Sequence, residues 1–212
     1  VVNADYDDAS VLVESKVFDK NGNIVADATG EGSIPLREKA IIKYSAVVKN
    51  PLLWDCDNPN LYNVKTTLFK NGVAIDENET RIGFRTVEIS IETGLLLNGK
   101  KTIIKGVCAH QDFGLTGLAV PDNIARYKVA LMKEMGANGY RTSHYQQTES
   151  YMDAFDEMGF LVMDEARWFE STKEGLEQLE TLVKRDRNRP SVIFWSTSNE
   201  EPTHVTDIGK RI

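Results

Sequence analysis

The sequence has 212 residues, of which 41% are hydrophobic and 27% are charged. These proportions are typical of a folded chain of one or two domains and argue against intrinsic disorder. The 32 acidic residues outnumber the 25 basic ones and give a net charge of −7. Because no basic face is visible, we expect no nucleic-acid partner. The apolar runs are only a few residues long, so we also expect no membrane partner.

The first 87 residues alternate short β-rich segments with turn signals. Hairpin turns are predicted at Asn21-Gly22 and at Asn71-Gly72. The segment 39–48 (KAIIKYSAVV) predicts a further strand, and Trp54 is interpreted as a residue of the same core. Several short strands without a helical period predict an immunoglobulin-like β-sandwich over residues 1–87.

From about residue 95 the pattern changes to alternating strands and helices. Four strands are predicted, at residues 102–107, 139–145, 160–164 and 191–195. Helices between consecutive strands predict a parallel sheet, and the unbroken apolar runs predict burial on both of its faces. Four such units are half of a (β/α)8 barrel. We therefore expect residues 88–212 to be the N-terminal half of a TIM barrel, with a small four-stranded sheet as the alternative.

In the first two predicted helices, the spacing of the apolar residues indicates which face is buried. The first begins at Asp122, and its inward residues are predicted to be Ile124, Tyr127, Leu131 and Met135. The second follows Thr148, and its inward residues are predicted to be Tyr151, Met152 and Phe155.

The two ends of the sequence suggest a piece of a longer protein. The sequence begins at Val1 without a Met or a secretory leader, and it ends at Ile212 inside a predicted helix. We expect an internal piece of a longer protein, and the missing leader favours a cytoplasmic location. Cys56 and Cys108 fall in different predicted domains, so we expect reduced thiols rather than a disulfide.

Polar side chains gather where the four predicted strands end, which is where barrel enzymes carry their chemistry. The first two strands lead into His110, Gln111, Asp112, Arg141, Ser143, His144 and Tyr145. The last two lead into Asp164, Glu165, Ser198, Asn199, Glu200 and Glu201. Random placement would rarely put histidines, carboxylates and an arginine on one rim.

Two long motifs carry a resemblance to a known family. The first is residues 138–145 (NGYRTSHY), followed by residues 156–162 (DEMGFLV), and the second is residues 186–200 (DRNRPSVIFWSTSNE). Together they resemble glycoside hydrolase family 2, the β-galactosidase/β-glucuronidase family. The chain departs from the family at Gln146, where the family usually has Pro. Shorter matches around Trp54 and in residues 83–100 extend the resemblance to nearly the whole chain.

The resemblance implies a retaining glycosidase, in which two carboxylates stand about 5–5.5 Å apart. It assigns Glu200 as the general acid/base and Asn199 as the partner of the sugar 2-hydroxyl. The second carboxylate, the nucleophile, would come from a strand beyond this chain, so we expect the chain to be inactive alone. The leading substrate is a terminal β-galactoside, with a β-glucuronide close behind.

Other site residues follow from the same resemblance. Arg141 would lie near the nucleophile, and His110 and His144 would line the sugar subsite. Trp168 would stack on a sugar ring. Some β-galactosidases of the family bind Mg²⁺ through a Glu and a His, but residues 166–171 (ARWFES) do not keep that pattern. We therefore predict no metal and no organic cofactor.

Several alternatives stay open. Glu200 is either catalytic or a solvated loop carboxylate, and Arg141 either serves the site or forms a structural salt bridge with Asp164. The chain is alternatively a carbohydrate-binding or scaffolding piece without catalysis, or an unrelated (β/α) enzyme with His110, His144 and Asp164 as metal ligands. Unpaired sheet edges would also favour a homo-oligomer.

Overall fold

A computed structural model of the chain describes residues 1–167, 172–200 and 206–207. The chain forms two compact units. The first contains Val1–Leu52 and Leu61–Ile82, and the second contains Leu53–Asn60 and Gly83–Ile212. A short segment that lies within the sequence of the first unit therefore belongs to the second.

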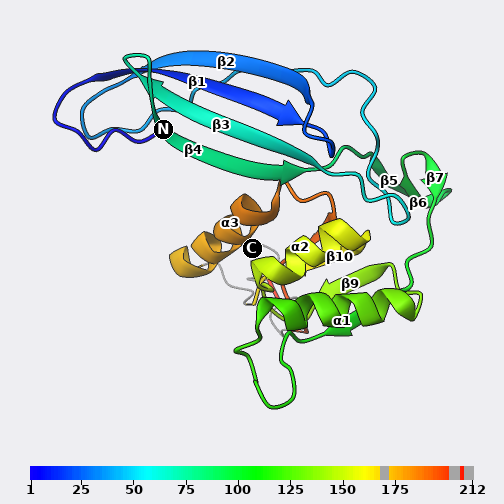
Figure 1. The fold of residues 1–212 in the computed structure, drawn as a ribbon. Helices are drawn as coiled ribbons and strands as arrows, with labels where there is room; N and C mark the ends of the chain where they lie inside the picture. Colours follow the sequence, from blue (N-terminus) through cyan, green and yellow to red (C-terminus); the bar gives the residue numbers. More distant parts are fainter. Residues whose placement is uncertain (168–171, 201–205, 208–212) are drawn as a thin grey trace. The chain divides into compact units, whose positions relative to one another are not determined.

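The first unit is built on one antiparallel sheet with the strand order β2-β1-β3-β4 (Figure 1). Its strands are β1 (Ala9–Phe18), β2 (Ile24–Ile34), β3 (Tyr62–Lys70) and β4 (Val73–Ile82). The two predicted hairpin turns are confirmed, because they join β1 to β2 and β3 to β4. Gly22 and Gly72 have φ values of 82° and 77°, a left-handed conformation that favours glycine.

The predicted strand at residues 39–48 is not a strand of a ladder. Lys39 forms one isolated bridge with Val2, and the rest of the segment has no regular strand pairing. The segment lies on β2 instead, where a Cβ on Gly30 would be 2.6 Å from the ring of Tyr44. The Tyr44 hydroxyl also hydrogen-bonds Ser15 of β1 at 2.8 Å. An extended segment held by side-chain packing therefore covers this face of the sheet.

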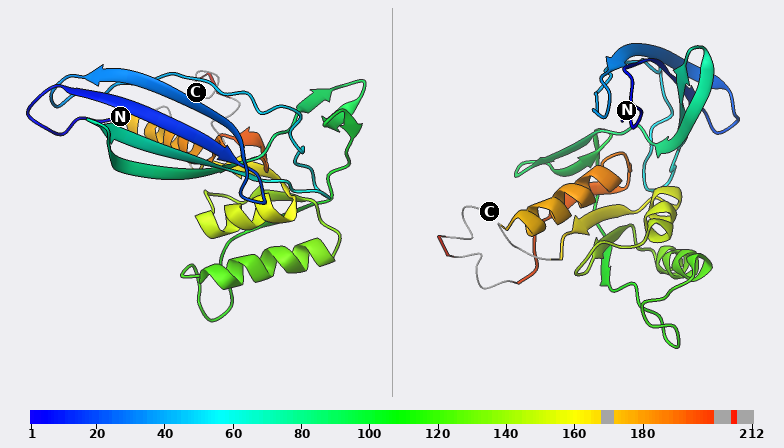
Figure 2. Two further views of the ribbon diagram at one scale, coloured as in Figure 1. Left: turned by 45° about the horizontal axis from the view of Figure 1, so that its top comes forward. Right: turned by 90° about the vertical axis from the view of Figure 1, so that its left-hand side faces the viewer.

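The second unit contains a parallel sheet with the order β11-β10-β9-β8. Its strands are β8 (Gly106–Ala109), β9 (Gly139–Thr142), β10 (Leu161–Glu165) and β11 (Val192–Ser196). The connecting helices are α1 (Asp122–Glu134), α2 (Glu149–Met158) and α3 (Lys173–Asp186), and α1 and α2 lie side by side (Figures 1 and 2). Each neighbouring strand pair is parallel, which confirms the predicted topology. The four strands form an open sheet, and no barrel closes within the described residues.

A second small sheet precedes the parallel one and was not predicted. It consists of β5 (Val87–Ser90), β6 (Gly94–Leu97) and β7 (Lys100–Lys101), paired antiparallel in that order.

The core of the second unit lies between the parallel sheet and the helices α1 and α2. The inward face predicted for α2 is confirmed, since Tyr151, Met152 and Phe155 are fully buried. The face predicted for α1 is wrong, because Tyr127 is 55% exposed and Met135 is 73% exposed. The buried stripe of α1 instead consists of Ala125, Val129 and Met132.

The segment Leu53–Asn60 is anchored to the second unit by Trp54 and Cys56. Trp54 is fully buried, and its indole Nε1 donates a hydrogen bond to the carbonyl of Asp156 at 2.8 Å. The carbonyl of Cys56 accepts from Nζ of Lys133 at 2.7 Å. The interpretation of Trp54 as a core residue of the first domain is therefore wrong. Its buried indole N–H requires an acceptor, and α2 supplies one.

Gly159 ends α2 against this segment and suggests a stability test. Its φ is 70°, and a Cβ there would lie 2.4 Å from the carbonyl oxygen of Cys56. Gly136 ends α1 with a φ of 89°, but a Cβ there meets open space. We expect Gly136→Ala to cost about 1–2 kcal/mol from backbone conformation alone. We expect Gly159→Ala to cost about 3 kcal/mol or more, because the collision adds to the same penalty.

Urea unfolding of both variants of the intact protein measures the difference. Equal losses of unfolding free energy in the two variants would mean that the segment around Cys56 does not rest on Gly159.

Candidate active site

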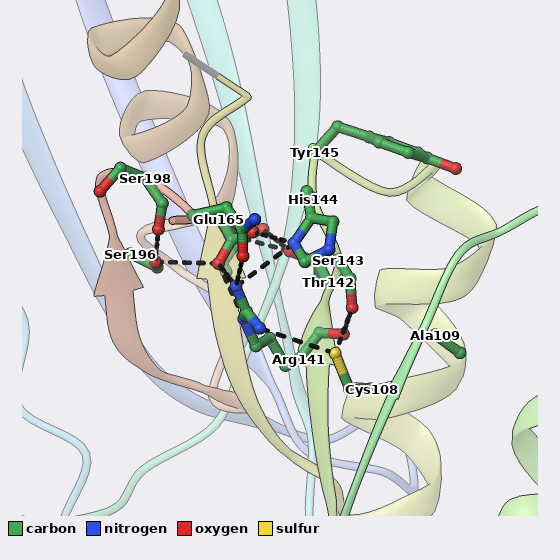
Figure 3. A network of polar contacts seen from close by, with 12 residues as sticks. Cys108, Ala109, Arg141, Thr142, Ser143, His144, Tyr145, Glu165, Ser196 and Ser198 are labelled. Atoms are coloured by element: carbon green, nitrogen blue, oxygen red, sulfur yellow. Dashed lines mark hydrogen bonds and ion pairs between the residues drawn. The ribbon is translucent and has the colours of Figure 1, made fainter. Parts of the chain in front are cut away.

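The centre of the site is an ion pair between two neighbouring parallel strands. Arg141 of β9 donates from Nε to Oε2 of Glu165 at 2.8 Å, and its Nη2 lies 2.7 Å from the same oxygen (Figure 3). Glu165 is the last residue of β10, and its side chain is fully buried, whereas the Arg141 side chain is 32% exposed. A buried carboxylate requires such a partner, because an unpaired charge in the interior is costly.

Both carboxylate oxygens and the backbone N–H of Glu165 have hydrogen-bond partners. The hydroxyl of Ser196 on β11 donates to Oε2 at 3.0 Å, and Nδ1 of His144 lies 2.9 Å from Oε1. The backbone N–H of Glu165 donates to Oγ1 of Thr142 at 2.8 Å. Figure 3 shows these groups converging from three strand ends. Glu165 therefore serves as the anchor of the network.

Arg141 extends the network to the residues after β11. Its Nη2 donates to Oδ1 of Asn199 at 2.7 Å and lies 3.3 Å from Nδ1 of His144. Burial lowers the pKa of Arg141, but the hydrogen bond with Glu165, the negative charge of Glu165 and the contact with Cys108 together outweigh burial and raise the pKa above the ordinary value. The guanidinium is therefore always charged. Because it can only donate, it selects the oxygen of the Asn199 amide and so orients that side chain.

The three aromatic rings at the ends of β8 and β9 lie together. The rings of His110 and His144 meet edge to face with centroids 5.5 Å apart, and the ring of Tyr145 lies 5.6 Å from that of His110. His110 is exposed, whereas His144 is half-buried. The imidazole of His110 thus extends the rim outward from the Glu165 network.

The predicted site residues fall into three groups. Arg141, His144 and Asn199 share one hydrogen-bond network, and His110 contacts that network through the ring of His144. Glu200 is exposed and follows Asn199 beyond the end of β11. Trp168 and Glu201 lie outside the described residues.

The predicted alternative of a salt bridge between Arg141 and Asp164 is wrong. Arg141 pairs with Glu165, because side chains one apart on a strand point to opposite faces. Sequence reasoning therefore missed Glu165 as the anchor and Ser196 as its second donor. Two adjacent carboxylates ending a buried strand were a usable signal, since each of them needs its own partners.

Comparison with known proteins decides the family. Residues 1–85 match the model of "Glycosyl hydrolases family 2", and residues 87–172 and 169–210 match that of "Glycosyl hydrolases family 2, TIM barrel domain". The chain belongs to glycosyl hydrolase family 2. This membership confirms the resemblance carried by the two long motifs. It also supports the predicted combination of an immunoglobulin-like domain with a TIM-barrel domain, as the two family models match consecutive parts of the chain.

Relatives within family 2 carry two activity names. A β-galactosidase of Bacteroides ovatus is 36% identical over 94% of this chain, and a β-glucuronidase of Bacteroides fragilis is 33% identical over 73% of it. The chain spans 25% and 24% of those two proteins. A solved family 2 structure from Bacteroides cellulosilyticus is 33% identical, covers 100% of this chain and 32% of its own, and superposes with a TM-score of 0.84.

On the other face of β10, this family 2 chain buries a second carboxyl group. Asp164 is fully buried, and its Oδ1 accepts a hydrogen bond from Oγ1 of Thr142 at 3.3 Å. Burial, and then the negative charge of the nearby Asp186, raise the pKa of Asp164 to about 7. Asp164 is therefore directed toward α3 and away from the Arg141 network.

The described part of this family 2 chain contains no group of three His, Cys, Asp or Glu side chains arranged to hold a metal ion. In particular, His144 contacts Glu165 while Asp164 contacts Thr142, so the trio of the metal-enzyme alternative does not converge. None of the helices in the described ranges is long and apolar enough to cross a membrane.

Proposed function

We propose that the intact protein hydrolyses terminal β-linked glycosides with retention of configuration, using Glu200 as the general acid/base. The observation that carries the proposal is the contact between Arg141 and Asn199, one residue before Glu200. It leaves the Nδ2 group of Asn199 to donate to a ligand, which is the contact a retaining glycosidase makes with the sugar 2-hydroxyl. The activity names of the relatives support the same reaction class.

The proposed reaction has two displacements. A carboxylate attacks the anomeric carbon while Glu200 protonates the leaving oxygen, which forms a glycosyl-enzyme ester. Glu200 then removes a proton from water, which attacks the same carbon and releases the sugar and the carboxylate. The nucleophile is proposed to lie in a part of the protein outside this chain, because the carboxylate of Glu165 is already buried and paired. The fixed charge of Arg141 would help to keep that nucleophile ionised.

The proposed substrate partner is a carbohydrate, with galactose as the leading sugar and glucuronic acid as the second candidate. The B. ovatus relative favours galactose. A β-glucuronidase of Bacteroides uniformis favours the second candidate, because its structure, 28% identical with a TM-score of 0.82, is covalently bound to cyclophellitol-6-carboxylate aziridine. Its covalent adduct is also the kind of product that a glycosidase with an enzymic nucleophile forms. His110, His144 and Trp168 are proposed to contact the sugar.

Chromogenic β-galactoside and β-glucuronide substrates, offered to the intact protein, test this proposal. The expected result is turnover of one of them, with the β-anomer as the first product seen by NMR. An α-anomer as the first product would refute retention. Sugar binding without turnover of either substrate would refute catalysis and leave the carbohydrate-binding alternative.

A further inference from the structure

Asp164 has a buried oxygen atom without a hydrogen-bond donor. Its Oδ1 accepts from Thr142, but its Oδ2 is buried with no partner among the described residues. An unsatisfied charged oxygen in the interior is strongly unfavourable. The protein must therefore either tolerate this cost or remove the charge from Asp164.

Asp186, at the end of α3, is the neighbour that decides between these two possibilities. It is fully buried and within hydrogen-bonding reach of Asp164. Its Oδ1 accepts from Nε of Arg189 at 2.8 Å, and its Oδ2 accepts from Nε of Arg185 at 2.8 Å. Because each oxygen of Asp186 has a guanidinium donor, Asp186 is the member of the pair that carries the charge.

We propose that Asp164 is a positioning residue, held as a neutral acid whose Oδ2–H donates to the carboxylate of Asp186. The proton satisfies the only unpartnered oxygen of Asp164 and removes a repulsion between two buried negative charges. This arrangement joins α3 to β10 by a hydrogen bond that exists only while the proton is present.

The consequence for the site is mediated by Thr142. Its Oγ1 donates to Oδ1 of Asp164 and accepts from the backbone N–H of Glu165. The side chain of Glu165 in turn holds Arg141, and Arg141 orients Asn199. The protonated pair thus supports the network from the opposite face of β10. The pair would hold the network in place whether or not the protein carries out the proposed hydrolysis.

The sign of the pH dependence follows from the groups that face the pair. Asp186 raises the affinity of Asp164 for its proton, whereas Arg185 on α3 and the hydroxyl of Thr142 on β9 lower it. Arg189 faces Asp186 and also pairs with Asp153 and Asp156 of α2. Because the pKa of folded Asp164 lies above its ordinary value, the stabilisation is present at low pH and is lost as the pH rises through the folded pKa.

The test uses the intact protein carrying Glu200→Gln, so that the proposed catalytic acid contributes no signal. Infrared difference spectra at about pH 6 compare this protein with the same protein carrying Asp164→Asn. The expected result is a carboxylic-acid C=O band that is absent from the Asp164→Asn protein. If the difference between the two spectra contains no such band, Asp164 is ionised and the proposal is overturned.

Hydrogen exchange gives an independent readout that does not use an absorbance band. After correction for the chemical exchange rate, peptides from β10 and α3 should exchange several-fold faster at about pH 9 than at about pH 6. With Asp164→Asn the increase should disappear, because the amide donates to Asp186 at every pH. Glu180→Gln, on the exposed face of α3, should keep the wild-type dependence. An unchanged increase in the Asp164→Asn variant would contradict the proposal.

Discussion

Replacing Glu200 by Gln in the intact protein is expected to lower kcat on glycosides with poor leaving groups by about 10²–10⁴-fold, the usual contribution of general acid catalysis. Gln has nearly the same shape but cannot transfer a proton to the leaving oxygen. For substrates whose leaving groups depart without protonation, the rate of the first displacement should fall less. The measurement is steady-state kinetics on two substrates of the same sugar that differ only in the pKa of the leaving group.

Glu201→Gln is the matched control, since it makes the same chemical change one residue further along the chain. It should keep most of the wild-type activity. If Glu200→Gln were as active as the wild type, the assignment at the end of β11 would be wrong, and the two-carboxylate mechanism would have to be placed on other residues.

Arg141→Met is expected to reduce the free energy of unfolding by about 3–5 kcal/mol, the usual cost of leaving one member of a buried ion pair alone. The side chain of Glu165 is fully buried, and Met preserves much of the volume of Arg but none of its donors. The donors that remain on Glu165 are Ser196 and His144. Urea unfolding of the intact protein, followed by a probe in this domain, measures the loss.

The double variant Arg141→Met with Glu165→Gln separates charge from packing. If the cost comes from the unpaired carboxylate, the double variant should recover a large part of the stability lost by Arg141→Met. The stability of Arg141→Lys should lie between that of the wild type and that of Arg141→Met. An ammonium keeps the charge but cannot reproduce the fork-shaped set of donors that reaches both Glu165 and Asn199. A loss below about 1 kcal/mol in Arg141→Met would show that Glu165 does not depend on Arg141.

The local pattern of the sequence was sufficient for the order of the elements and for the location of the rim. The strands β9, β10 and β11 each follow a helix, and β10 and β11 begin with short apolar runs; strands that alternate with helices predict parallel neighbours wherever the connections are short. Parallel strands end at one edge, so the sequence alone predicts that Arg141, His144 and Asn199 lie on the same rim. The two hairpins were equally predictable, since Asn-Gly supplies the positive φ that such turns require.

Faces and partners were less predictable than the elements themselves. Larger apolar residues suggested one face for α1, but its buried stripe consists of Ala125, Val129 and Met132. These three positions also recur at helical spacing, so periodicity alone does not choose between the two stripes. The choice depends on the surfaces of α2 and the sheet, which accept the smaller side chains.

The sequence by itself determined the class of the fold, the order of its elements and the rim on which polar residues collect, because these depend on periodicity and spacing along the chain. Only the tertiary structure decided that Trp54 packs on α2, that Arg141 binds Glu165 and that Asp164 faces Asp186. Each of these pairs joins residues of different elements, and two of them depend on which side of a strand a residue points to. A buried indole, guanidinium or carboxyl group must find a partner, but the pattern of the chain does not name that partner.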